Sequence, residues 1–280
     1  MALLLVAGAL SAEPLQLTQD GRLKQTPVFR EAGREVVFVE MNDPTLFQLR
    51  RLVLADGTNE PLHPKATASE FEPSWSADGE CYAFLKLKGV LTIGISVCDK
   101  AGAELGEIPA EPGFFGYRSP AVSPDRTRVA YAFPLGGAQQ IYVAGLKGEN
   151  RQPLTDSRGI NNWPHYSADG HGIVFSSSRD GNYEVYRMNA DGTDQVRLTD
   201  SPYQDIRPRF SPDGRRIAFT SHRDGNPEIY LINSDGSFPR RITHNPDRDD
   251  YPAWHPDGQQ LVIVSEREGK SELWLVDVGE

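Results

Sequence analysis

The sequence is poor in cationic residues, because its 29 Lys and Arg are outnumbered by 39 Asp and Glu, and the net charge is −10. A chain of this sign repels phosphate backbones, so we expect no nucleic-acid partner. The sequence also lacks an apolar run of about 18 residues, the length that a membrane-spanning helix needs, and we expect no such helix. These two absences argue against a nucleic-acid-binding protein and against a protein that spans a membrane with helices.

Cysteine is nearly absent, with Cys81 and Cys98 as the two copies. A turn near Lys88-Gly89 would join two antiparallel strands and could place the two cysteines opposite each other. A disulfide needs their Cα atoms within about 7 Å. If the protein is exported, one prediction is a Cys81–Cys98 bridge, and the other is two free buried thiols.

Motifs of catalysis are also lacking. The sequence has no Gly-x-Ser-x-Gly nucleophile elbow and no His-Glu-x-x-His zinc motif. Its six histidines fall at different positions of the repeat described below, so we expect no metal site and no cofactor.

Glycine and proline are plentiful, with 26 and 21 copies spread along the chain. This spread indicates many short strands joined by turns, in one large domain or two ordinary ones. A repeat organises them: segments 163–192, 207–236 and 251–277 nearly superimpose, and weaker copies precede them. Each copy opens with a proline, namely Pro27, Pro73, Pro120, Pro164, Pro208 and Pro252.

Each copy contains four short apolar runs separated by glycine turns, which is typical of antiparallel hairpins. Six such four-stranded units predict an all-β, six-bladed β-propeller over residues 13–280. The last copy ends after its third strand, whereas Leu15-Gln-Leu-Thr18 matches the fourth strand of other copies. Thr18 stands nine residues before Pro27, as Thr155 does before Pro164. We therefore predict that the N-terminal strand completes the last blade.

Residues 1–12 form an uncharged apolar stretch that ends in Ser11-Ala12. This pattern predicts a signal peptide, and hence a periplasmic or secreted protein, with a buried N-terminal strand as the alternative.

The pattern over residues 210–243, Phe-Ser-Pro-Asp-Gly-x-x-Ile-Ala-Phe followed by Arg-Asp-Gly-Asn-x-Glu-Ile-Tyr, resembles the WD40-like PD40 repeat of the TolB family. The resemblance covers nearly all of residues 13–280 and implies the propeller domain only. It also implies an envelope setting, as for the periplasmic Tol–Pal system, and a protein or peptide partner. Similar propellers occur in prolyl-oligopeptidase-like enzymes and in oligogalacturonate lyases, which hold a metal with histidines.

The loops between blades differ most from copy to copy, so we expect binding on that face, although unconstrained drift would give the same pattern. The residues expected nearest the channel mouth precede the opening prolines, and Phe114 and Phe115 are the expected aromatic anchors. The channel-mouth candidates are Glu70, Tyr117, Arg118, Asn161, Asn162, Asp205, Asp249 and Asp250.

A second repeated feature is an Arg followed five residues later by a Glu, as in Arg179 and Glu184 or Arg223 and Glu228, which we interpret as ion pairs across a hairpin. Together these patterns predict an exported, monomeric, non-enzymatic interaction module. The alternative is a carbohydrate-active or metal-assisted enzyme that uses the channel mouth.

Overall fold

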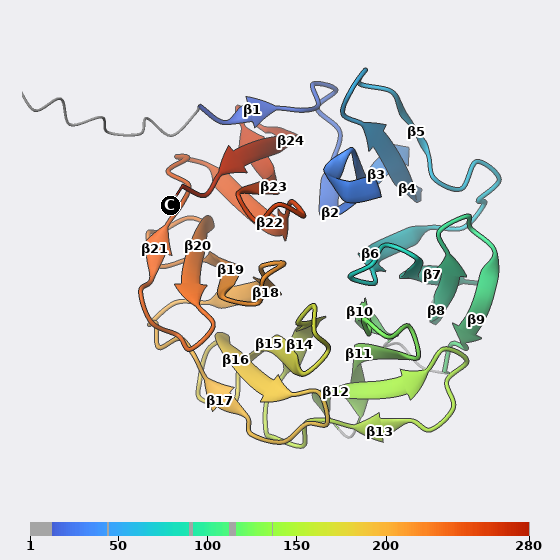
Figure 1. Ribbon diagram of the computed structural model, residues 1–280. Coiled ribbons are helices and arrows are strands. Elements are labelled where there is room, and N and C mark those ends of the chain that lie inside the picture. Colours follow the sequence, from blue (N-terminus) through green and yellow to red (C-terminus); the bar gives the residue numbers. More distant parts are fainter. Residues whose placement is uncertain (1–12, 44, 90–91, 112–115, 136, 280) are drawn as a thin grey trace, which may run out of the picture.

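Six four-stranded antiparallel sheets form a ring around a central channel (Figure 1). The computed structural model describes residues 13–43, 45–89, 92–111, 116–135 and 137–279. The predicted all-β six-bladed propeller is confirmed. No helix in these described ranges is long and apolar enough to span a membrane. The predicted signal peptide lies outside them.

Each blade runs from an inner strand at the channel to an outer strand at the rim. The first two blades consist of β2 (Lys24–Arg30), β3 (Glu35–Asp43), β4 (Leu46–Val53) and β5 (Asn59–Pro61), and of β6 (Glu70–Trp75), β7 (Cys81–Lys88), β8 (Thr92–Asp99) and β9 (Glu104–Ile108). The third and fourth consist of β10 (Arg118–Val122), β11 (Arg128–Leu135), β12 (Ala138–Gly145) and β13 (Gln152–Pro153), and of β14 (Asn161–Tyr166), β15 (Gly172–Ser177), β16 (Glu184–Asn189) and β17 (Val196–Arg197).

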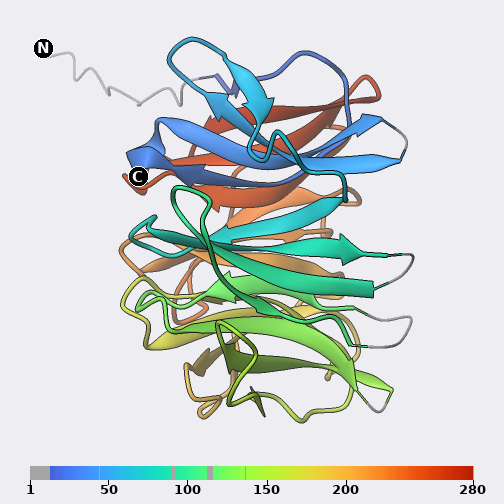
Figure 2. The same cartoon turned by 90° about the vertical axis from the view of Figure 1, so that its right-hand side faces the viewer.

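The fifth blade consists of β18 (Asp205–Phe210), β19 (Arg216–Ser221), β20 (Glu228–Asn233) and β21 (Arg240–Arg241). The sixth consists of β22 (Arg248–Trp254), β23 (Gln260–Arg267), β24 (Lys270–Asp277) and the N-terminal β1 (Leu15–Gln16). A short 3₁₀ turn, η1 (Glu31–Gly33), joins β2 to β3. Seen edge-on, η1 and the C-terminal end lie on the same face of the ring (Figure 2). This is expected if the first and third turns of each blade share one face.

The hydrophobic core lies between the blades. In β3 the run Val36-Val-Phe-Val39 is fully buried. Its side chains alternate, because Val36 and Phe38 pack with the sixth blade and Val37 and Val39 with the second. A strand covered on both faces needs an unbroken apolar run, and the second strand of every blade supplies one.

The N-terminal strand closes the ring as predicted. Leu15 pairs with Leu275 and Gln16 with Trp274 in an antiparallel ladder between β1 and β24. Thr18 completes the closure, because its hydroxyl donates to Glu272 and accepts a 2.9 Å bond from the Leu273 amide. The same arrangement holds β21 inside the fifth blade, where Thr243 takes the role of Thr18.

Of the two alternatives for the cysteines, the structure has the free buried thiols and not the Cys81–Cys98 bridge. They do lie on the neighbouring strands β7 and β8, but Cys81 pairs with Asp99 and Cys98 with Tyr82. This offset of one residue turns the two side chains to opposite faces of the sheet. Cys81 therefore packs toward the third blade and Cys98 toward the first.

The predicted Arg–Glu pairs across the hairpins are wrong. Glu184 accepts from Thr199 at 2.6 Å and pairs with Arg197 at 3.0 Å, in the outer part of its own blade. Arg179 instead stacks on Tyr186, with its guanidinium carbon 4.7 Å from the ring centroid. The repeated Arg thus stacks on an aromatic ring and bonds partners other than the repeated Glu, such as Asp205 for Arg223, and the repeated Glu fixes the outermost strand to the blade.

Candidate functional site: the central channel

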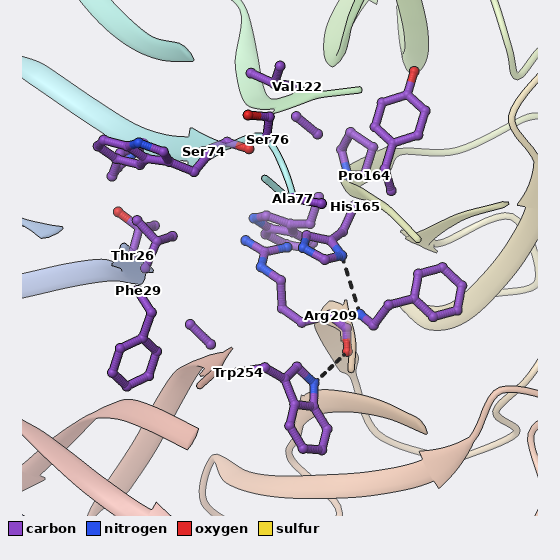
Figure 3. Close-up of a pocket in the computed structure, with 18 of the residues that line it drawn as sticks. Thr26, Phe29, Ser74, Ser76, Ala77, Val122, Pro164, His165, Arg209 and Trp254 are labelled. Atoms are coloured by element: carbon purple, nitrogen blue, oxygen red, sulfur yellow. Dashed lines mark hydrogen bonds between the residues drawn. The ribbon is translucent and has the colours of Figure 1, made fainter. Parts of the chain in front are cut away.

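A cavity of about 380 Å³ occupies the channel and is lined by the inner strands of all six blades (Figure 3). The six opening prolines each lie on one of these strands. Immediately before the proline, each inner strand is interrupted by a shift of register against its neighbour. The inner strands therefore present a bulge to the channel at the same place in every blade.

The residue before each proline has a left-handed backbone, with φ between 45° and 57°. We call these six residues, which all line the cavity, the inner ring: Thr26, Glu72, Ser119, Trp163, Arg207 and Tyr251. A left-handed conformation costs of order 1 kcal/mol or more for a residue other than glycine, and such costs cluster at functional sites. The fold repeats this conformation six times with six different side chains.

The aromatic part of the inner ring holds an arginine. Arg207 lies between Trp163 and Tyr251, with its guanidinium carbon 5.0 Å and 4.2 Å from their ring centroids. Its Nη1 donates to both carboxylate oxygens of buried Asp250 at 3.2 Å. Burial alone would raise the pKa of Asp250, but Arg207 and Arg248 lower it, so this carboxylate stays charged.

A second layer is formed by the residues that follow the prolines, and we call it the lower ring: Val28, Ser74, Ala121, His165, Arg209 and Ala253. His165 and Arg209 point into the cavity side by side (Figure 3). Nδ1 of His165 accepts a 3.3 Å bond from the Phe210 amide. Burial, with a contribution from Arg209, lowers the pKa of His165 to about 3, so its ring is neutral near pH 7.

The predicted channel-mouth residues do not line this cavity. Six of them are buried in hydrogen-bond networks between strands and loops: Glu70, Tyr117, Asn161, Asp205, Asp249 and Asp250. For example, Asp205 pairs with Arg223 at 2.8 Å, and Asn161 donates to Gln140 at 2.9 Å. Arg118 is exposed and Asn162 is half-buried, so these two remain accessible. Phe114 and Phe115 lie outside the described residues.

The bulge explains this difference. All eight candidates stand two or three residues before a proline, and in a regular strand these two positions face opposite sides of the sheet. The extra left-handed residue breaks the alternation and puts the residue directly before the proline into the cavity instead. The variability of the six inner-ring positions in the sequence is the signal that could have found them.

No group of three or more His, Cys, Asp or Glu side chains that could hold a metal occurs within the described part of the chain. His165 accepts a hydrogen bond from a backbone amide, and Arg209 is the charged member of the lower ring beside it. What the channel offers is a mixed surface of aromatic rings, hydroxyls and guanidinium groups.

A family model described as the TolB beta propeller domain matches residues 33–205, more than half of the chain. The chain belongs to the TolB β-propeller family. A second model, the Tricorn protease N-terminal beta propeller domain, matches residues 190–279 of this TolB-like propeller.

Solved structures share the fold. The chain is 22% identical to a putative TolB from Agrobacterium tumefaciens, with a TM-score of 0.72 and coverage of 94% of this chain and 93% of that one. It is 18% identical to TolB from Acinetobacter baumannii, with a TM-score of 0.70 and coverage of 90% and 66%. An oligogalacturonate lyase from Vibrio parahaemolyticus gives 14% identity, a TM-score of 0.60 and coverage of 95% and 93%. At these identities the likeness establishes the propeller alone.

Proposed function

We propose that this TolB-like propeller is a non-enzymatic interaction module that binds a segment of a partner protein at its central channel. The inner ring carries the proposal, because six blades of one design present six different side chains at one strained position. Trp163, Tyr251 and Arg207 belong to the residue types that dominate protein recognition sites. Arg118 and Asn162, the accessible members of the predicted mouth, would contact the partner outside the cavity.

The size of the cavity supports a segment rather than a folded domain as the occupant. A volume of about 380 Å³ lies at the lower end of the range for ligand pockets. It accommodates a few side chains of a loop or chain end. The remaining contacts with a folded partner would then come from the loops around the mouth.

We further propose that the protein is exported to the periplasm and works as a monomer. The apolar stretch over residues 1–12 and the resemblance to TolB support export. Fusing residues 1–40 to a phosphatase that is active only outside the cytoplasm tests this, and a fusion without activity in intact cells contradicts it.

The binding proposal is tested by affinity capture from an envelope extract with the wild-type protein and two variants. Trp163→Ala removes an inner-ring aromatic and should abolish capture of the partner. Phe238→Ala is the matched control, because Phe238 is an aromatic that is 80% exposed in a turn outside the channel lining. Equal capture by all three proteins would contradict binding at the channel.

A divalent-metal titration by calorimetry separates this proposal from a metal-assisted enzyme. We expect no stoichiometric binding. Tight binding that disappears in His165→Ala would overturn the non-enzymatic proposal, because His165 is the histidine of the cavity lining.

A further inference from the structure

Arg209 is a charged side chain in the cavity that no carboxylate of the described residues neutralises. Its Nη1 donates to the Pro208 carbonyl oxygen at 3.1 Å. Among the described residues, no carboxylate lies within ion-pairing distance of its guanidinium, although Glu72 attracts it from farther away. A guanidinium has five N–H donors, and within the described ranges the bond to Pro208 is the one that the Arg209 side chain makes.

The other arginine of the cavity has partners for its charge within the protein. Arg207 is bonded to Asp250 and stacked between two aromatic rings. Glu72, the carboxylate of the lining, is already bonded to the amide of Ser119. Arg207 and Glu72 therefore have partners of their own, and Arg209 stands apart from both.

The backbone around Arg209 is nevertheless held firmly from both sides. The indole Nε1 of Trp254, in the sixth blade, donates to the Arg209 carbonyl oxygen at 3.0 Å. The amide of the next residue, Phe210, donates to His165 in the fourth blade (Figure 3). The sixth and fourth blades thus both hold the one peptide unit that links Arg209 to Phe210.

Such an arrangement raises the free energy of the folded state. Burial, with repulsion from Arg207, lowers the pKa of Arg209 to about 10, so the guanidinium is still charged near pH 7 while the fold disfavours that charge. Arg209 is half-buried, so its charge is partly withdrawn from water, and an anion that reaches it would compensate that loss.

We propose that Arg209 binds a carboxylate of the peptide segment that enters the channel. This inference rests on the proposed function and adds the chemistry of the ligand. The planar guanidinium matches a carboxylate with two parallel hydrogen bonds. Phe29, Trp75 and Trp254 line the same cavity, so an apolar side chain next to the carboxylate would be buried with it. The carboxylate is either the C-terminus of the partner or an Asp or Glu side chain.

Two arrays of the same random heptapeptides test the proposal. In one array the peptides are anchored by their N-terminus and carry a free C-terminal carboxylate. In the other they are anchored by their C-terminus and carry none. Both are probed with the wild-type protein, with Arg209→Gln and with Arg187→Gln. The last is the matched control, because Arg187 is exposed and outside the cavity lining.

We expect binding to fall by about tenfold or more in Arg209→Gln and to be unchanged in Arg187→Gln, as for the loss of a hydrogen-bonded charge. Binders confined to the free-carboxylate array would identify the C-terminus as the anion. Binders on both arrays with Asp or Glu at a fixed position would identify a side chain.

Peptides that bind wild type and Arg209→Gln equally would overturn the carboxylate inference and leave peptide binding intact. No binding to wild type on either array would overturn both. Arg209→Lys keeps the charge without the planar fork and should bind at an intermediate level. Arg209→Gln should melt at the same temperature as wild type or higher, which shows that its lost binding is not lost folding.

Discussion

Replacing Thr18 by valine tests whether the Thr18 hydrogen bonds hold the N-terminal strand in the sixth blade. The Thr18 hydroxyl donates to the Glu272 carboxylate and accepts from the Leu273 amide at 2.9 Å. Valine has nearly the same shape, so the packing remains and both bonds disappear. A bond to a charged group contributes about 1.5–3 kcal/mol and a buried unpaired amide costs about 1–3 kcal/mol. We expect a loss of about 3 kcal/mol in the free energy of unfolding.

Urea unfolding followed by fluorescence measures this loss, and calorimetry should show a melting temperature lower by about 6–10 °C. Thr243→Val is the matched control, because Thr243 makes the same two contacts with Glu228 and Ile229 inside the fifth blade. Both variants should lose similar free energy. If Thr243→Val loses about 3 kcal/mol and Thr18→Val less than 1 kcal/mol, then β1 does not lock the sixth blade. Deletion of residues 13–19 should be more damaging than either substitution, because it also removes the β1 ladder.

Three further predictions follow from the interior. Phe219→Ala should lower the unfolding free energy by about 3–5 kcal/mol in urea titrations, since Phe219 packs with Val174 between two blades. A loss no larger than that of an exposed-site substitution would contradict that packing. Burial raises the pKa of Asp205 to about 6, so its charge costs stability as the pH rises from 4 to 7; Asp205→Asn should gain about 2 kcal/mol relative to wild type over that interval in unfolding titrations, and a constant difference would refute the shift. Cys81 and Cys98 should react with a thiol reagent only upon unfolding, since both are buried and burial raises the pKa of Cys81 to about 11, and a reducing agent should leave the melting temperature unchanged.

The repeat made most of the fold predictable. The spacing of the prolines located every inner strand, and the nine-residue interval between Thr18 and Pro27 identified the strand that closes the ring. These predictions succeeded because they depend on local patterns that recur in each blade. The strands of a weak copy can therefore be located by aligning it with the stronger copies.

The predictions about single side chains failed where one residue of offset decides the outcome. The β7–β8 hairpin was recognised, but a register shifted by one residue separates Cys81 from Cys98. In the same way, a left-handed residue before each proline moved the cavity lining away from Asp205 and Asp249 and onto positions such as Trp163. Backbone conformations of this kind are set by tertiary packing, and the one sign of them in this sequence is the variable residue before each opening proline.

The closing strand also fixes the order in which the molecule is completed. Thr18 and Leu273 are 255 residues apart, so the contact between them forms only after nearly the whole chain has left the ribosome. Closing a loop of that length costs about 5 kcal/mol of chain entropy, which the short β1 ladder cannot offset until the inner blades have already brought the two ends together. We therefore expect the internal blades to fold first, and β24 to keep a free edge until β1 pairs with it.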